Sequence, residues 1–159
     1  MPDAHTSVLF VCLGNICRSP VAEGVFLHLA AQHGVADRFR VDSCGTGGWH
    51  AGERPDPRSL AVAHRHGVTL PGTARKYTPK TDNQFDAIIA MDASNHADLL
   101  AAGAPADRTH LLRAFDPAYA HDPDRAPDVP DPYYGGPDGF DTMFEMIERA
   151  CAGLLMSFT

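Results

Sequence analysis

Short apolar runs along the chain mark the expected strands of a sheet. The run 7–11 (SVLFV) is almost wholly apolar and ends where glycine and polar residues begin, which predicts a buried parallel strand. Alternation over 39–43 (FRVDS) predicts a second strand, and the run 85–91 (FDAIIAM) predicts a third. Residues 109–112 form a fourth candidate. We therefore expect a sheet of four short strands.

Helical signals separate these runs. Ser19, which precedes a proline, predicts an N-cap, and Gly34 predicts the end of the helix that follows. Asp56, also before a proline, predicts the start of a second helix, and Asp92 is expected to cap a third. Over 140–155 apolar side chains recur at three- and four-residue steps, which predicts a closing amphipathic helix.

Strands that alternate with helices over the whole length predict an α/β fold. We expect a three-layer sandwich, with a central four-stranded parallel sheet and helices on both faces, as a single domain over residues 1–159. Ligands of such folds bind beyond the carboxyl ends of the strands, and Cys12 falls at such an end. The aperiodic stretch 113–137, rich in proline and aspartate, is long enough to be a lid or binding element.

Composition narrows the function classes. A formal charge of −7 and a pI near 5.6 provide no basic field for nucleic acid or for an anionic membrane surface. No stretch has the length and apolar character of a membrane span or of a secretion signal, so the cytoplasm is the expected compartment and no membrane insertion is expected. Four cysteines are too few for a disulfide scaffold, and nine histidines without ligand spacing predict no metal site.

The segment CLGNICRS carries the strongest chemical signal. Cys12 and Arg18 stand six residues apart between the first strand and the first helix, which predicts a phosphate-binding loop there. Gly14 and Asn15 tolerate positive φ, so backbone N–H groups can converge on an anion beside the positive end of the helix. Arg18 adds a planar fork for two phosphate oxygens, and the same field, with the hydroxyl of Ser19, favours the thiolate of Cys12.

A phosphate monoester bound in this loop would lie with its phosphorus in front of the sulfur of Cys12. In-line attack would then give a phosphocysteine intermediate. The leaving oxygen needs a proton, and the later hydrolysis needs a base, so a carboxyl group must stand over the site. Several aspartates of the stretch 113–137 can fill this role, and the chemistry alone does not choose among them.

The sequence resembles the low-molecular-weight protein tyrosine phosphatase family over essentially its full length. VLFVCLGNICRSPVAEGVF at 8–26 matches the phosphate loop of that family, and DPYYGG at 131–136 matches its acid-loop motif. VDSCGTGGWH at 41–50 and MDASN at 91–95 also look like family segments. The resemblance implies a cysteine-dependent protein-tyrosine phosphatase that hydrolyses phosphotyrosine, or aryl phosphate monoesters generally, without a cofactor or a metal.

The resemblance also implies a role for individual residues. It chooses Asp131 as the general acid and then base, beside Cys12 as the nucleophile and Arg18 as the phosphate-binding arginine. The implied phosphate-binding loop comprises Leu13, Gly14, Asn15, Ile16, Cys17, Arg18 and Ser19. The implied supporting residues are Asn15, Ser19 and Ser43, and the implied walls around the substrate ring are Trp49, Tyr133 and Tyr134. Cys17 is implied as the partner that forms a reversible disulfide with Cys12 and protects it from further oxidation.

Three other residues are expected to have structural roles only, and one residue departs from the family pattern. Asp92 is expected to act as a helix cap, and Cys44 and Cys151 are expected to be packing residues. Gly72 stands where many family members carry a histidine that hydrogen-bonds the loop asparagine. We therefore expect the contact between Asn15 and Ser43 to be the least secure part of the site.

Two other functions can be built on such a loop. An arsenate reductase passes oxidation from its nucleophile to two further cysteines, but no cysteine lies between Cys44 and Cys151 to take part in such a relay. A non-catalytic phosphotyrosine-binding module needs neither a nucleophile nor an acid, whereas both are present here. Hydrolysis is therefore the favoured function.

The expected partner is a phosphotyrosine-bearing protein. A bacterial tyrosine kinase and a host protein are both candidates, and the residues do not choose between them. Aromatic side chains around the site can serve either the substrate or a weak dimer, so a monomer and a weak dimer are both left open.

Overall fold

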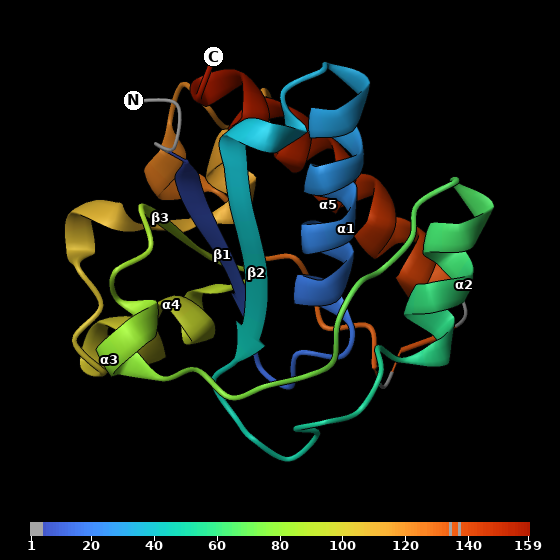
Figure 1. Ribbon diagram of the computed structural model, residues 1–159, viewed down its shortest axis with the longest axis horizontal. Coiled ribbons are helices and arrows are strands. Elements are labelled where there is room, and N and C mark those ends of the chain that lie inside the picture. The colour runs from blue at the N-terminus through green and yellow to red at the C-terminus, as the bar shows by residue number, and fades with distance from the viewer. Residues whose placement is uncertain (1–4, 134, 137) are drawn as a thin grey trace.

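A computed structural model describes residues 5–133, 135–136 and 138–159, and within these residues four parallel strands form one sheet (Figure 1). The strands are β1 (Thr6–Cys12), β2 (Phe39–Gly45), β3 (Ala87–Ala90) and β4 (Thr109–Leu111), in the order β2-β1-β3-β4. Each pair of neighbouring strands is parallel, which confirms the expected parallel sheet. The strand order makes β1 a central strand, flanked by β2 and β3.

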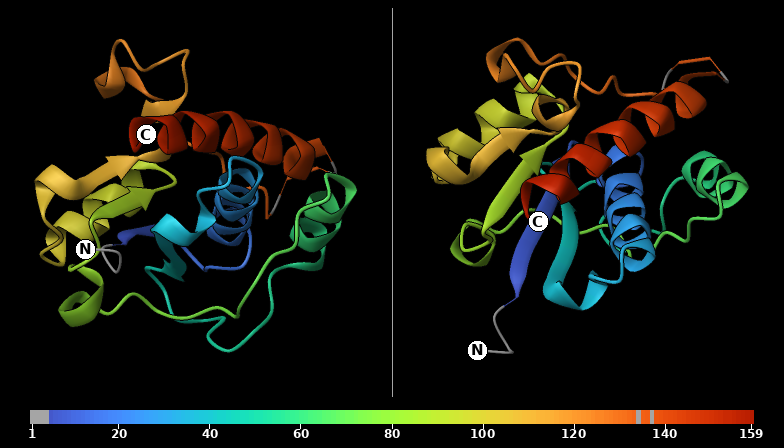
Figure 2. Two further views of the ribbon diagram at one scale, coloured as in Figure 1. Left: turned by 45° about the horizontal axis from the view of Figure 1, so that its top comes forward. Right: turned by 90° about the horizontal axis from the view of Figure 1, so that it is seen from above.

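The strands alternate with helices. These are α1 (Arg18–Gln32), α2 (Pro57–Arg65), α3 (Pro79–Asp82), α4 (Ala93–Ala101) and α5 (Asp138–Ser157). Figures 1 and 2 show α1, α2 and α5 on one side of the sheet and α3 and α4 on the other. The three-layer α/β sandwich is therefore confirmed. Single turns of 3-10 helix lie at Ala36–Arg38, Ala106–Arg108, Leu112–Phe115 and Pro123–Arg125.

The side chains of β1 alternate between the two faces of the sheet. Val8 and Phe10 pack into the cluster formed with α1 and α5, whereas Leu9 and Val11 pack into the cluster on the α4 side. All four are fully buried. A strand covered on both faces explains why the run 7–11 contains so few polar residues.

The sequence predicted the C-terminal end of α1 but not its N-cap. Gly34 has a φ of 70°, its N–H donates to the carbonyl of Ala31, and the N–H of Val35 donates to the carbonyl of Ala30. These bonds end the helix as predicted. The expected N-cap was wrong, because the helix begins at Arg18 and Ser19 already lies inside it. The hydroxyl of Ser19 is thereby directed toward the end of β1 instead of capping the helix.

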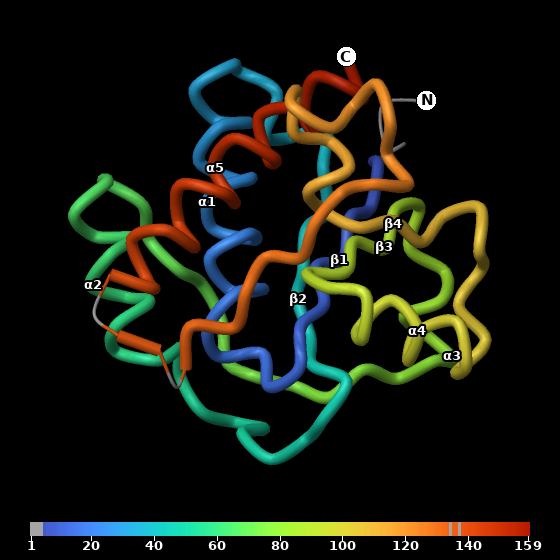
Figure 3. The backbone as a smooth tube through the Cα atoms, turned by 180° about the vertical axis from the view of Figure 1, so that it is seen from behind, coloured from blue at the N-terminus to red at the C-terminus, as the bar shows by residue number. Residues whose placement is uncertain are grey.

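The stretch 113–137 is anchored to the sheet on its way to the candidate acid Asp131. The N–H of Val129 donates to the carbonyl of Met91 at 2.8 Å, and the side chain of Val129 is fully buried. One residue earlier, a carboxylate oxygen of Asp128 accepts from the N–H of Ala93 at 2.9 Å. These contacts lead the chain past the carboxyl ends of the strands and toward the phosphate loop (Figure 3).

Neither a membrane-spanning helix nor a metal-binding cluster occurs in the described part of the chain. No helix there is long and apolar enough to cross a membrane. No group of three or more histidine, cysteine, aspartate and glutamate side chains there is arranged to hold a metal ion.

Candidate active site

The segment 13–17 joins β1 to α1 as a tight loop at the carboxyl end of the sheet. Asn15 has a φ of 57°, as its residue type allows, and its N–H lies 3.3 Å from the sulfur of Cys12. Gly14, expected to share this conformation, does not have a positive φ. A Cβ added at Gly14 would lie 3.1 Å from the ring of His50, so that ring would have to shift by a few tenths of an ångström to admit a side chain there.

The first residues after β2 hold this loop through backbone hydrogen bonds. The N–H of Thr46 donates to the carbonyl of Cys12 at 2.9 Å, and the N–H of Gly47 donates to the carbonyl of Leu13 at 2.9 Å. Gly45 permits this approach, because a Cβ there would lie 2.7 Å from the carbonyl oxygen of Leu13. These contacts hold the backbone of the loop against the segment that follows β2.

The sulfur of Cys12 lies in a polar environment although the residue is only 2% exposed. Its sulfur is 3.0 Å from the hydroxyl of Ser19. Because that hydroxyl accepts a hydrogen bond from Nδ2 of Asn15 at 2.8 Å, its own hydrogen is left for the sulfur or for the carbonyl of Cys44 at 3.4 Å. The shorter contact is with the sulfur, and the hydroxyl can stabilise a thiolate there.

Arg18 is buried at the start of α1 and held by protein oxygens. Its Nη1 donates to Oδ2 of Asp92 at 2.6 Å and to the carbonyl of Val129 at 3.0 Å. Burial alone would lower the pKa of Arg18, but the charges of Cys12 and Asp92 raise it above its ordinary value. Arg18 therefore stays cationic in a site from which most water is excluded.

Asp92 has two roles, of which the sequence indicated one. Its Oδ1 accepts from the N–H of Asn95 at 2.7 Å, which confirms the expected cap of α4. Its Oδ2 holds Arg18. The second role depends on β3 lying beside β1, which places Asp92, two residues after the end of β3, next to the start of α1. That neighbourhood is a property of the strand order, and the local sequence does not contain it.

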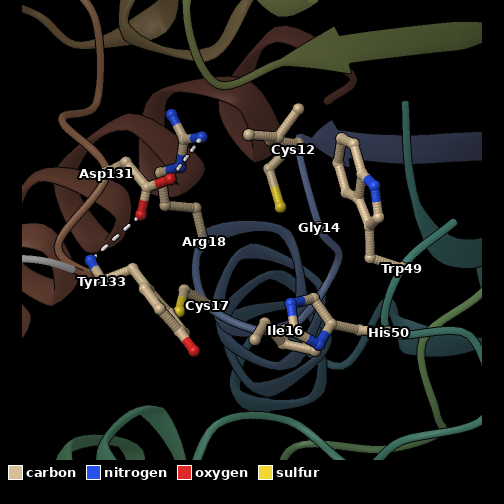
Figure 4. Close-up of a pocket in the computed structure, with 10 residues that line it drawn as sticks. Cys12, Gly14, Ile16, Cys17, Arg18, Trp49, His50, Asp131 and Tyr133 are labelled. Atoms are coloured by element: carbon tan, nitrogen blue, oxygen red, sulfur yellow. Dashed lines mark hydrogen bonds and ion pairs between the residues drawn. The ribbon is translucent and has the colours of Figure 1, made fainter. Parts of the chain in front are cut away.

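A cavity of about 390 Å³ opens above Cys12 (Figure 4). Its described lining contains Cys12, Leu13, Gly14, Ile16, Cys17, Arg18, Trp49, His50, Asp131 and Tyr133. Three further expected site residues, Asn15, Ser19 and Ser43, are buried and do not line it. Tyr134 lies outside the described residues. His50 was not expected, although it is the last residue of the segment 41–50 and follows Trp49 directly in the sequence.

Asp131 lies beside Arg18 at the rim of the cavity. Its Oδ2 is 3.6 Å from Nη2 of Arg18, and its Oδ1 accepts from the N–H of Tyr133 at 3.0 Å (Figure 4). The side chain of Asp131 is 41% exposed and therefore accessible to water. The sulfur of Cys12, the guanidinium of Arg18 and the carboxyl group of Asp131 thus surround one space that is large enough for a phosphate ester.

Comparison with known proteins agrees with this arrangement. The sequence model of the low molecular weight phosphotyrosine protein phosphatase family matches residues 7–159. The chain belongs to this family.

Three relatives illustrate how close the likeness is. The chain is 47% identical over 152 residues to the low molecular weight protein-tyrosine-phosphatase of Streptomyces coelicolor, covering 93% of this chain and 90% of the relative. The crystal structure of a protein tyrosine phosphatase from Entamoeba histolytica superposes with a TM-score of 0.87 at 34% identity and covers 96% of each chain. A Drosophila arginine phosphatase superposes with a TM-score of 0.83 at 30% identity, covering 96% of this chain and 97% of the other.

The side chain of Asn15, in the phosphate loop, has its hydrogen-bond partners despite Gly72. Nδ2 of Asn15 donates to the hydroxyl of Ser43 at 3.0 Å, and Oδ1 of Asn15 accepts from the backbone N–H of Arg75 at 3.0 Å. Gly72 itself is exposed and has a φ of 76°. The expectation that this glycine weakens the contact between Asn15 and Ser43 was therefore wrong, because a backbone N–H from the same segment binds the asparagine.

Glu23 is a buried carboxyl group at the end of this network. Its Oε1 accepts from the hydroxyl of Ser43 at 2.7 Å. Burial raises the pKa of Glu23 from 4.5 to about 7; the bond from Ser43 and the charge of Arg75 lower it, and the charge of Asp42 adds to the rise. Sequence patterning missed this residue, since nothing in a helical segment marks one glutamate as buried.

Glu23→Gln is expected to change how stability depends on pH. Between about pH 4.5 and pH 7 the folded protein holds a proton on Glu23 that the unfolded chain releases, so its contribution to stability falls as the pH rises through this window. From pH 5 to pH 8 the wild type should lose about 2 kcal/mol more than the glutamine variant. Urea unfolding at both pH values measures this difference. Parallel losses in the two proteins would contradict it.

Cys17 lines the cavity next to Cys12, and all four cysteines are free thiols. Burial raises the pKa of Cys17 to about 12, and the negative charge of Asp56 adds to the effect. Cys17 is therefore a thiol at neutral pH and does not compete as a nucleophile. Cys44 and Cys151 are fully buried, as expected of packing residues.

Proposed function

We propose that this chain hydrolyses phosphotyrosine on proteins through a phosphocysteine intermediate formed on Cys12. The observation that carries the proposal is the cavity itself. It has the sulfur of Cys12 at its floor, Arg18 and Asp131 on one side, and apolar or aromatic side chains such as Ile16 and Trp49 on the others.

In the first step the thiolate of Cys12 attacks phosphorus, and the bond from phosphorus to the phenolic oxygen breaks. Arg18 and the N–H groups of the loop bind the three non-bridging oxygens, on which the negative charge of the transition state is spread. Asp131, protonated, gives its proton to the leaving phenolic oxygen. The products of this step are tyrosine and phosphocysteine.

In the second step water displaces the sulfur. Asp131, now ionised, takes a proton from the attacking water, and inorganic phosphate leaves as the thiolate of Cys12 is restored. The hydroxyl of Ser19, 3.0 Å from the sulfur, stabilises the thiolate as a leaving group. Both steps use side chains of the chain itself.

The walls of the cavity favour an aromatic ester over a phosphorylated guanidino group. Ile16 and Leu13 are aliphatic and Trp49 and Tyr133 are aromatic, so a substrate ring gains apolar contacts away from the side that Arg18 and Asp131 occupy. The N–H groups of phosphoarginine would lose water against Ile16, and each unpaired polar group costs about 1–3 kcal/mol. Phosphotyrosine is therefore the proposed substrate, although an arginine phosphatase shares the fold.

Matched peptides test this choice directly. We expect phosphate release from a phosphotyrosine peptide to exceed release from the same peptide carrying phosphoarginine by about 100-fold in kcat/KM, a difference of about 3 kcal/mol. A phosphoserine peptide serves as a third substrate with a short apolar stem. Faster release from phosphoarginine would overturn the proposed substrate class, and no release from any of the three would overturn the proposed reaction.

We infer that the substrate is a protein acting in the cytoplasm. Trp49 is 71% exposed and lines the cavity, where a polypeptide chain can contact it. The nucleophile requires a compartment that keeps its thiol reduced. A bacterial tyrosine kinase is one candidate substrate, and a host protein is another. Capture on Cys12→Ser, followed by identification of phosphotyrosine-bearing proteins, would separate the two.

A further inference from the structure

Arg58 lies outside the catalytic group, yet it joins the two loops that carry that group. It is the second residue of α2, and its side chain is 48% exposed. The guanidinium carbon is 4.6 Å from the ring centre of Phe140 and 5.3 Å from that of Tyr133. A half-exposed arginine held against two aromatic rings is ordered by cation–π contacts.

One side of this arginine is tied to the phosphate loop. Its Nε and Nη2 donate to the two carboxylate oxygens of Asp56 at 3.0 and 2.9 Å, a bidentate pair. The backbone N–H of Asp56 donates to the carbonyl of Ile16 at 2.8 Å, and the hydroxyl of Ser59 donates to the carbonyl of Cys17 at 3.2 Å. The first turn of α2 is therefore bonded to two residues of the phosphate loop.

The other side of Arg58 is tied to the acid loop. Its Nη1 donates to the carbonyl of Tyr133 at 3.1 Å, and the N–H of Tyr133 donates to the carboxylate of Asp131 at 3.0 Å. Figure 3 shows the acid-loop segment running down to the region between α1 and α2. A continuous series of bonds thus leads from Ile16 through Asp56 and Arg58 to the residue that holds the carboxylate.

We propose that Arg58 is a positioning residue that fixes the carboxyl group of Asp131 relative to the sulfur of Cys12. The proposal rests on the proposed function, because it assigns Arg58 a part in proton transfer to the leaving group. Upstream of Asp131 the loop is fixed by the bonds of Val129 to Met91 and Arg18, and Arg58 fixes it downstream. A misplacement of about 1 Å can cost a catalytic group up to about 100-fold in rate.

Arg58→Met separates this role from a general effect on folding. Methionine keeps an unbranched apolar side chain between the two rings but cannot bond to Tyr133 or Asp56. Because a misplaced acid matters most for a poor leaving group, kcat/KM for phenyl phosphate should fall about 10-fold, and kcat/KM for 4-nitrophenyl phosphate should fall less than about 2-fold. Arg58→Lys retains the positive charge but not the planar fork, so its kcat/KM values should lie between those of the wild type and those of Arg58→Met.

Arg65→Met is the matched control. Arg65 lies on the same helix, and its Nη2 is 2.6 Å from Oδ1 of Asp141 on α5, so its removal breaks an ion pair of α2 without touching the acid loop. Its leaving-group dependence should equal that of the wild type. An equal change in Arg65→Met would overturn the proposal, because the effect would then belong to α2 as a whole.

A double-mutant cycle with Asp131→Asn completes the test. If Arg58 acts through the carboxyl group, Arg58→Met should add less than about 2-fold to the loss already caused by Asp131→Asn with phenyl phosphate. Independent, multiplying losses would overturn the positioning role while leaving the proposed function standing. A wild type that hydrolyses neither ester would overturn the proposed function, and the role of Arg58 with it.

Discussion

Replacing Cys12 with serine is expected to lower kcat for an aryl phosphate by about 10⁴-fold or more. The loop that surrounds the sulfur is arranged for an anion, with the N–H of Asn15 at 3.3 Å and the hydroxyl of Ser19 at 3.0 Å. A serine hydroxyl does not ionise at neutral pH, so these donors have no nucleophilic anion to stabilise. Steady-state kinetics with 4-nitrophenyl phosphate measure the loss.

The binding of phosphate should survive this change. Arg18 and its partners Asp92 and Val129 do not contact the substituted atom, so isothermal titration with inorganic phosphate should give a Kd within about 10-fold of the wild type. Cys151→Ala, in the buried face of α5, is the control for loss of a thiol elsewhere and should keep full activity. Retained turnover in Cys12→Ser would show that another group attacks phosphorus.

Asp131→Asn is expected to lower kcat/KM for phenyl phosphate by about 10²- to 10⁴-fold, the range of general acid catalysis. The amide has the size of the carboxyl group and can still accept from the N–H of Tyr133, but it carries no proton to give to the leaving oxygen. The loss should be smaller with 4-nitrophenyl phosphate, whose leaving group needs less protonation. A series of aryl phosphates with graded leaving groups measures this difference. The kcat/KM of Asp131→Asn should depend more steeply on the leaving group than the kcat/KM of the wild type.

Asp128→Asn supplies the control from the same loop. Asp128 accepts a hydrogen bond from the N–H of Ala93 and does not line the cavity, so its amide variant should keep the leaving-group dependence of the wild type. The same dependence in wild type and Asp131→Asn would place the acid elsewhere in the molecule.

Local patterns predicted the parts of the molecule that local physics determines. The buried run 7–11 became β1, Gly34 ended α1, and Asp56 and Asp92 capped their helices. Each depends on side chains within a few residues of one another, so sequence spacing is enough to find it.

The parts that could not be predicted join segments far apart in the chain. The pair of Arg18 and Asp92 spans 74 residues, and the bond from Arg58 to Tyr133 spans 75. Such contacts follow from the strand order and from the path of the acid loop, neither of which leaves a periodic signal. The donor that binds the side-chain oxygen of Asn15 was equally hidden, because it is the backbone N–H of Arg75, and every residue type except proline offers an N–H.

The hydrogen bonds that hold Arg18 also affect how the product phosphate competes with the substrate. Nη1 is held by Asp92 and Val129, which are parts of the protein itself, so an arriving oxyanion has little side-chain freedom to remove. That advantage does not distinguish the ester from the free phosphate that hydrolysis leaves behind, since both present the same oxygens to the loop. Product inhibition is therefore inherent in the site, and the ambient concentration of inorganic phosphate sets how much of the enzyme is free for its substrate.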